Sequence, residues 1–357
     1  MIERIEIRNF KSIQKLDLRL NPVNILIGAN GAGKSNFIDF FQLVNKIYEG
    51  KLKLYSEQKG ANNLLYRGIK HSSYIMGLLD FDNTNAYKFI VKPGNDDVLY
   101  ISEEGDFFNK DEDDSKNYNS NWHWHLAEPP YRYDSENRAW YVKNYLKSFR
   151  VYHFHDTSDT SPMKVSSQID DNDFLRENGG NLASFLYYLQ QKHQAIFKRI
   201  EMAVRSIAPF FERFDLKPRR INPDQIKLEW KERDSDMYLD AHNFSDGTLR
   251  FIALATLLMQ PDPPKTILID EPELGLHPVA VHKLGSLIQK ASATCQVIVS
   301  TQSIELVNNF LPEDIITVDR SNGQSVFRRL EKDSLEHWLE TFSLGDIWQK
   351  NIIGGQP

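Results

Sequence analysis

Apolar residues follow two different spacings along the first fifty positions. Apolar and polar residues alternate over 5–7 and over 16–20, which predicts two antiparallel strands with one face in water. The unbroken apolar run at 23–27 predicts a buried strand, and the apolar residues of 34–48 recur at helical spacing. We therefore expect a strand, a glycine-rich turn and a helix in direct succession.

The last third of the chain alternates between the two element types. The expected elements are helix 247–259, strand 266–270, helix 278–290, strand 296–300, helix 303–309 and strand 314–318. Strands that alternate with helices in this way form a parallel sheet covered by helices.

The segment between these two parts is less regular. Short alternating stretches at 73–80, 86–92 and 97–102 predict an antiparallel meander, and the acidic stretch 109–119 predicts a solvated loop. We interpret 49–148 as an insertion.

The insertion is followed by a strand at 149–154, a single amphipathic helix over 181–207 and strands near 212–217 and 225–230. The predicted fold class is α/β, with a mixed sheet, an antiparallel meander lobe and a helical or irregular insertion. The expected segments are 1–48 (first half of the core), 49–148 (insertion), 149–240 (strand and helical middle) and 241–357 (second half of the core).

Composition and charge narrow the class of protein. The formal net charge of −6 gives no general attraction to nucleic acid. The longest apolar run, 251–259, is about half of a membrane span, so no membrane contact is expected. A single cysteine, Cys295, cannot form an intramolecular disulfide, and the start of the chain has no secretory signal pattern. We therefore expect a cytoplasmic protein.

The glycine-rich turn has the P-loop pattern of a glycine, four residues and then Gly-Lys-Ser. Backbone N–H groups of such a turn surround phosphates, and the helix N-terminus adds partial positive charge. Lys34 is expected to reach the β and γ phosphates, and the Ser35 hydroxyl to bind Mg²⁺. The predicted ATP-binding residues of this turn are Gly28, Asn30, Gly31, Gly33, Lys34, Ser35 and Asn36.

An apolar strand that ends in two carboxylates supplies the second part of a phosphate-transfer site. At the end of the run 266–269, Asp270 is expected to bind Mg²⁺, and Glu271 to act as the general base on the attacking water.

A third motif carries a family resemblance. Ser245-Asp246-Gly247-Thr248 opens an apolar helix and resembles the ABC signature, although alone such a triplet is usually a helix N-cap. With Gly275-Leu276-His277-Pro278 and the opening Ile7-Arg8-Asn9-Phe10-Lys11-Ser12, the chain resembles the SMC/RecF/OLD-like ABC ATPases. Within them it resembles the compact prokaryotic AAA15/AAA21 group.

The resemblance implies an ABC-type P-loop NTPase head that hydrolyses MgATP. In this family the signature, here Ser245 and Gly247, covers the γ-phosphate held by a second head. A head-to-head homodimer or higher oligomer is therefore implied, because each chain carries both half-sites.

One position departs from the family pattern. The switch position after the strand 296–300 is commonly His, whereas this chain has Gln302, which can orient water or bond the γ-phosphate but cannot carry a proton. Slow turnover is therefore expected, with Gln302 and Glu271 as the catalytic residues. His277 is expected at the interface between heads, and His155 and Asp156 are candidates for the Q-loop residue.

Three further sequence patterns could indicate a functional site, but a structural or surface role explains each of them more simply. The histidines of 122–125 and 153–155 share a strand face but have no second ligand pair nearby, so a structural role is favoured over a metal site. The aromatic and basic stretch 131–150 fits a partner-protein surface or an amphipathic helix better than a nucleic-acid platform. The basic cluster 217–220 is expected to be a charged turn.

The implied function is an ATPase whose dimerisation gates a separately encoded effector, a nuclease or toxin, as in anti-phage defence operons. A RecF-like DNA-binding repair head is the first alternative. A slow or non-hydrolysing nucleotide sensor is the second.

Overall fold

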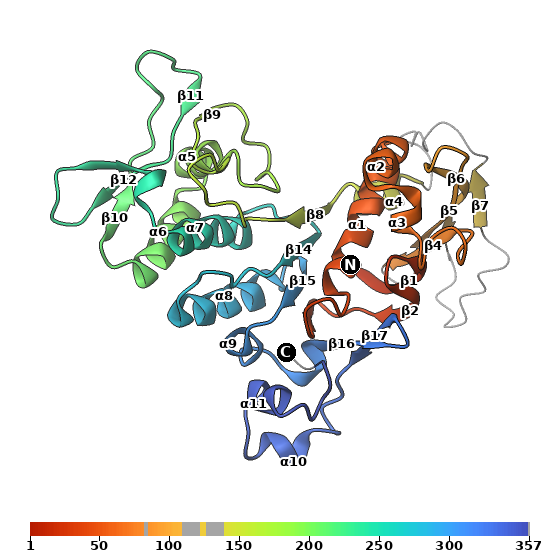
Figure 1. Cartoon of the computed structure of the whole chain (residues 1–357). Helices are drawn as coiled ribbons and strands as arrows, with labels where there is room; N and C mark the ends of the chain where they lie inside the picture. The colour runs from red at the N-terminus through yellow and green to blue at the C-terminus, as the bar shows by residue number, and fades with distance from the viewer. Residues whose placement is uncertain (82–84, 109–121, 126–138, 356–357) are drawn as a thin grey trace.

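The computed structural model describes residues 1–81, 85–108, 122–125 and 139–355. Two six-stranded sheets dominate the molecule (Figure 1). The first sheet is antiparallel and has the order β2-β1-β4-β5-β6-β7. Its strands are β1 (Ile2–Phe10), β2 (Ile13–Arg19), β4 (Ile75–Phe81), β5 (Asn85–Pro93), β6 (Leu99–Phe108) and β7 (Trp122–His125).

The second sheet has the order β17-β16-β3-β15-β14-β8 and is parallel except for β17, which pairs antiparallel with β16. Its strands are β3 (Val23–Ile27), β8 (Phe149–Tyr152), β14 (Thr266–Asp270), β15 (Gln296–Thr301), β16 (Ile315–Ser321) and β17 (Gln324–Arg329). The predicted parallel sheet and the predicted meander are both confirmed. The meander strands β4, β5 and β6 extend the sheet that β1 and β2 begin.

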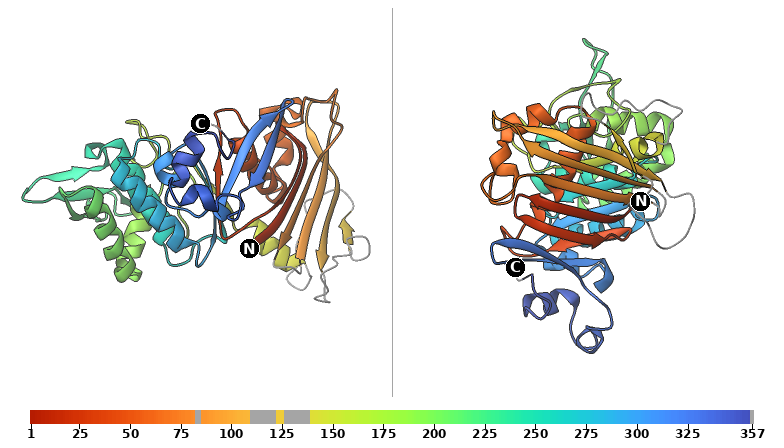
Figure 2. Two further views of the ribbon diagram at one scale, coloured as in Figure 1. Left: turned by 90° about the horizontal axis from the view of Figure 1, so that it is seen from below. Right: turned by 90° about the vertical axis from the view of Figure 1, so that its right-hand side faces the viewer.

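Helix α1 (Lys34–Tyr48) lies between the two sheets. Phe40 stacks on Phe89 of the first sheet, with ring centroids 5.9 Å apart, whereas Phe41 meets Phe149 of the second sheet at 5.7 Å. Because α1 buries residues toward both sheets and leaves one polar stripe half-buried or exposed, the helical spacing seen in the sequence reflects contacts with two layers. The left-hand view of Figure 2 shows these layers from below, and the right-hand view shows the first sheet face-on.

The other face of the second sheet is covered by α7 (Asp246–Met259) and α8 (Pro278–Ala291). The remaining helices are α2 (Leu52–Lys59), α3 (Ala61–Leu64), α4 (Ala139–Leu146), α5 (Leu182–Lys192), α6 (Gln194–Ile207), α9 (Ile304–Val307), α10 (Glu336–Leu339) and α11 (Leu344–Gln349), with 3-10 turns at Ala241–Asn243 and Pro312–Asp314. In the described ranges no helix is long and apolar enough to cross a bilayer.

Two sequence predictions in the middle segment are wrong. The helix predicted over 181–207 is two helices, because the backbone of His193 leaves the helical region (φ −131°, ψ 52°). The break lets α6 pack on both α5 and α7.

The strand predicted at 225–230 is also divided. Its first part, β11 (Gln225–Ile226), pairs with β9 (Ser167–Gln168), and its second part, β12 (Glu229–Glu232), pairs with β10 (Phe211–Phe214) and β13 (Tyr238–Asp240). The predicted acidic loop 109–119 lies outside the described residues. The four-segment division of the chain stays a prediction.

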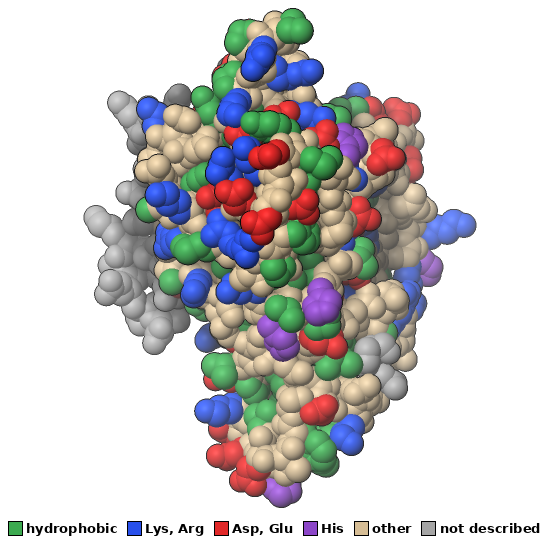
Figure 3. Space-filling model, turned by 90° about the vertical axis from the view of Figure 1, so that its left-hand side faces the viewer, with side chains coloured by type: hydrophobic (Ala, Val, Ile, Leu, Met, Phe, Trp, Pro, Cys, Tyr) green, Lys and Arg blue, Asp and Glu red, His purple; other side chains and the backbone are tan. Residues whose placement is uncertain are grey.

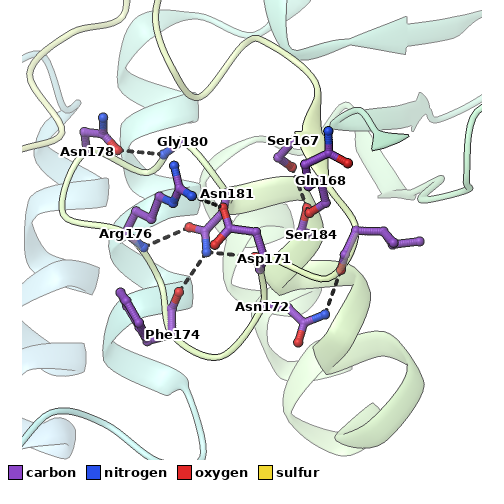
Figure 4. A network of polar contacts seen from close by, with 11 residues as sticks. Ser167, Gln168, Asp171, Asn172, Phe174, Arg176, Asn178, Gly180, Asn181 and Ser184 are labelled. Carbon is purple, nitrogen blue, oxygen red and sulfur yellow. Dashed lines mark hydrogen bonds and ion pairs between the residues drawn. The ribbon is translucent and has the colours of Figure 1, made fainter. Parts of the chain in front are cut away.

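The buried side chain of Asn181 organises the loop before α5 (Figure 4). Its Nδ2 donates to the carbonyls of Asp171 (3.0 Å) and Phe174 (2.7 Å), and its Oδ1 accepts from the N–H of Arg176 (2.8 Å). The carbonyl of Glu177 in this loop then accepts from the N–H of His153 at 2.9 Å. Asn181 therefore supports the segment that follows β8.

Candidate functional site

The carboxyl ends of five parallel strands meet at one edge of the second sheet. These strands are β8, β14, β15, β3 and β16. Ligands of open parallel sheets bind at this edge. The predicted P-loop follows β3, the two carboxylates follow β14 and the switch glutamine follows β15, so three of the predicted motifs converge here.

The P-loop joins β3 directly to α1, the context that the motif requires. Gly33 precedes α1 with φ 119°, and a Cβ at this position would lie 2.0 Å from Ser325 Oγ. Only glycine fits there. Because no side chain caps α1, the N–H groups of its first turn are available to an anion.

Lys34 is held against the loop that it belongs to. The side chain is 5% exposed, and its Nζ donates to the carbonyls of Gly28 (2.5 Å) and Ala29 (3.1 Å). Burial lowers the pKa of Lys34, against the opposing effect of Glu271 and Asp270. The ammonium group thus lies in the field of both strand-end carboxylates.

Asp270 ends β14 with one oxygen unsatisfied. Its Oδ1 is buried and has no hydrogen-bond partner within the described part of the chain. A buried carboxylate oxygen is costly without a partner, and a divalent cation is the partner that this position fits. Ser35, in the first turn of α1, is exposed and supplies a hydroxyl of the kind that binds Mg²⁺ in P-loops.

Gln302 joins the P-loop to the second carboxylate. Its Nε2 donates to Asn30 Oδ1 at 2.7 Å and also to Glu271 Oε1. Glu271 itself has a left-handed backbone (φ 44°), and its N–H donates to the Ser300 carbonyl at 2.8 Å. Such strain in a non-glycine residue is held in place by its surroundings and clusters at functional sites.

The Ser-Asp-Gly motif opens α7. Ser245 caps the helix by accepting from the N–H of Thr248 at 3.2 Å, as such a triplet usually does. A Cβ on Gly247 would lie 2.3 Å from the Gly275 carbonyl oxygen, so the helix start packs closely on the loop after β14. Ser245, Gly247, Gly275 and His277 line a hollow of about 120 Å³.

The two Q-loop candidates differ in position. His155 Nε2 lies 2.8 Å from the Asp270 carbonyl oxygen, whereas Asp156 is exposed and accepts from Ser158. His153 and His155 follow β8 instead of sharing a strand face, which corrects that prediction. His153 Nε2 contacts Gln42 Nε2 at 3.1 Å.

A larger hollow of about 560 Å³ lies beside α1. Lys11, Asn36, Asn62 and Arg67 are among its lining residues. Asn36 Nδ2 donates to Ser12 Oγ at 2.6 Å, so this P-loop residue faces the turn between β1 and β2. Of these residues, Asn62 and Arg67 had no motif to mark them.

Sequence reasoning also missed Arg250. Its guanidinium is buried in α7 and donates to the carbonyls of Phe154 (2.9 Å) and His155 (3.1 Å). Burial lowers the pKa of Arg250. This contact links the signature helix to the segment beside Asp270. In the sequence, the only signal for Arg250 was a charged residue among the apolar residues of a predicted helix.

Of the signals that were given simpler interpretations, His155 lies beside Asp270 of the site. No group of three or more His, Cys, Asp or Glu among the described residues could hold a metal ion. Of the stretch 131–150, residues 131–138 lie outside the described residues, and the rest contains α4 and the start of β8. Lys217 of the basic cluster pairs with Asp215 at 2.9 Å.

Comparison with known proteins identifies a family for most of the chain. Residues 23–308 match the model of a family described as "AAA domain, putative AbiEii toxin, Type IV TA system". No curated protein sequence matches the chain.

Two solved structures of SMC heads are similar in fold. An SMC head bound to the C-terminal winged-helix domain of ScpA has a TM-score of 0.62 and 19% identity, over 93% of this chain and 99% of that one. An SMC head with an extended coiled coil, bound to a ScpA domain from Pyrococcus furiosus, has a TM-score of 0.59 and 16% identity, over 95% and 98%.

A match over most of the chain shows the family, and the two SMC heads are similar to this chain in fold. The protein belongs to the AAA-domain family described as a putative AbiEii toxin of a type IV toxin–antitoxin system, and it has the fold of an SMC-head P-loop ATPase.

Proposed function

We propose that this protein binds ATP at the carboxyl edge of the second sheet and hydrolyses it. The observation that carries the proposal is the convergence of Lys34, Asp270 and Glu271 beside the uncapped N-terminus of α1. The N–H groups of the loop bind the phosphates, and Lys34 exchanges its two carbonyl partners for phosphate oxygens.

Ser35 and Asp270 would hold Mg²⁺, whose charge neutralises the β and γ phosphates when it is bound. The 560 Å³ hollow beside Asn36 fits the nucleoside end of the ligand, because its amide and cationic side chains offer hydrogen-bond donors.

Glu271 is the proposed general base, and Gln302 orients the attacking water. Because Gln302 contacts both Glu271 and Asn30, its side-chain amide lies between the proposed base and the P-loop. Glutamine can donate and accept hydrogen bonds but cannot take up a proton at neutral pH. Its part is therefore orientation, and the proton goes to the carboxylate.

A second copy of the chain completes the site. Ser245, Gly247 and His277 line the smaller hollow, and the nearby side chains of Leu274 (49% exposed) and Val279 (57% exposed) present apolar surface to solvent. A helix N-terminus with exposed apolar neighbours fits the phosphate of a nucleotide carried by another molecule. Because each chain holds both half-sites, the assembly is a symmetric dimer.

Dimerisation is proposed to gate a separately encoded effector in anti-phage defence. The family description as a putative toxin of a type IV toxin–antitoxin system supports a toxin-linked role. On the face shown in Figure 3, the described Lys and Arg side chains intermingle with Asp and Glu. A basic stripe, the electrostatic mark of a nucleic-acid surface, is not the pattern of this face, so we favour the effector over the RecF-like alternative.

Phosphate release and mass-resolved chromatography test these proposals together. Wild-type protein should release phosphate from MgATP, and Lys34→Ala should not. Glu271→Gln should bind ATP, release little phosphate and accumulate as a dimer. Lys53→Ala, on an exposed turn of α2, is the matched control and should behave as wild type.

Each contrary result has a separate meaning. Dimerisation without phosphate release would replace hydrolysis by nucleotide sensing, and ATP-dependent, salt-sensitive DNA retention would favour the repair head. Absence of nucleotide binding would overturn the proposal altogether.

A further inference from the structure

The side chain of Gln302 depends on a backbone that lies at the end of a strand. Glutamine has several rotatable bonds, so its amide is placed well only where the main chain beneath it is fixed. Gln302 follows the last residue of β15, Thr301, and precedes Ser303, which caps α9. These three residues, 301–303, form the switch segment.

One carboxylate contacts two residues of the switch segment directly and the third through the Thr301 hydroxyl. Glu273 Oε1 accepts from the Thr301 hydroxyl at 2.6 Å and from the N–H of Gln302 at 3.0 Å. The Thr301 hydroxyl oxygen in turn accepts from the N–H of Ser303 at 3.0 Å. Glu273 reaches this segment because β14 and β15 are parallel neighbours, with Asp270 opposite Ser300.

The second carboxylate oxygen of Glu273 lowers the stability of the folded chain. Oε2 is buried and has no hydrogen-bond partner within the described residues. Burial raises the pKa of the Glu273 carboxyl, against the hydrogen bonds from Thr301 and Gln302. A buried acid with one unsatisfied oxygen lowers stability. Stabilisation of the fold therefore does not explain why Glu273 lies between the ends of β14 and β15.

We propose that Glu273 is a positioning residue that fixes the switch segment and thereby aims the Gln302 amide at the γ-phosphate and the attacking water. This inference rests on the proposed hydrolysis and extends it to a second acidic residue, which does not contact the reacting atoms. Glu271 and Glu273 thus have separate tasks. The first takes the proton, and the second holds the residue that orients the water.

A double-mutant cycle tests the kinetic part. Glu273→Ala should lower kcat about tenfold, because loss of a hydrogen bond to a charged group raises the reaction barrier by about the amount that gives this ratio. KM should change less than about twofold. In a Gln302→Ala background the same substitution should have almost no further effect, because both act through one amide. Glu273→Gln keeps an acceptor oxygen and should recover most of kcat.

Amide hydrogen exchange tests the structural part without nucleotide. Glu273→Ala should speed exchange at Gln302 and Ser303 at least tenfold and leave β14 unchanged. Glu305→Ala is the matched control. The exposed carboxylate of Glu305 accepts from the Ser303 hydroxyl, its one hydrogen bond with the switch segment in the described part of the chain, so this variant should leave the Gln302 amide protected.

The outcomes separate this inference from the proposed function. Absence of phosphate release by wild-type protein contradicts hydrolysis, whereas the exchange experiment still judges the positioning role. Multiplicative effects of Glu273→Ala and Gln302→Ala on kcat, or unchanged exchange at Gln302, would show that Glu273 does not hold the switch segment.

Discussion

Gln302 Nε2 lies 2.7 Å from Asn30 Oδ1, so a side chain from the end of β15 contacts the P-loop that follows β3. The two strands are direct neighbours in the sheet, with Thr301 opposite Ile27. Under the proposed function, this contact would couple the switch position to a phosphate in the loop. A bound γ-phosphate would compete for the same amide.

Replacement of this amide should slow turnover. Gln302→Ala is expected to lower kcat about tenfold and to change ATP affinity less than about twofold, because the contact acts mainly on the water and the base. Steady-state phosphate release and nucleotide titration measure the two quantities. Gln349→Ala, an exposed glutamine at the end of α11, is the control, and an equal kcat for both variants would contradict the assigned role.

Gly247 should not tolerate a side chain. In Gly247→Ala the new Cβ meets the Gly275 carbonyl oxygen at 2.3 Å, so the start of α7 and the loop after β14 must separate. We expect a loss of about 1–3 kcal/mol in the free energy of unfolding and loss of the ATP-dependent dimer. Gly94→Ala, where the nearest atom to a Cβ lies at 3.6 Å, should change stability by less than about 0.5 kcal/mol.

Asn181→Ala should destabilise the loop that precedes α5. The substitution leaves the carbonyls of Asp171 and Phe174 and the N–H of Arg176 without their buried partner. A cost of about 1–3 kcal/mol in the free energy of unfolding follows, measured by urea denaturation. Asn178→Ala removes one exposed contact to Gly180, and a comparable loss in this control would show that burial is not the cause.

His153 should make stability depend on pH. Burial lowers its pKa below the usual 6.5, so the unfolded chain binds the proton more readily than the folded chain. Its contribution to stability is therefore complete above about 6.5 and is lost as the pH falls below that value. Melting temperatures of wild type and His153→Gln between pH 7.5 and 5.5 measure this, and the variant should show the smaller decrease.

The sequence predicted the parts of the fold whose pattern is local. Strand 266–270 and helix 34–48 have the predicted bounds, because an apolar run beside glycine or acidic residues marks both ends. The break at His193 was not predictable in this way. Apolar spacing continues across that residue, and the turn is set by contacts of α6 with α7.

The same distinction applies to the site. Lys34 and Asp270 lie in motifs that neighbouring residues define, so their places could be expected. Glu273 and Arg250 act on segments that are distant in sequence, the switch segment and the carbonyls after β8. Only the pairing of strands shows which residues those side chains reach.

Helix α1 joins the two sheets, since Phe40 packs on one sheet and Phe41 on the other. A ligand that pulls on its first turn would therefore shift two hydrophobic cores together. Neither sheet could be cut away to make a smaller functional unit, because the exposed phenylalanines would drive aggregation. The antiparallel sheet is thus as much a part of the nucleotide machinery as the strands that carry the carboxylates.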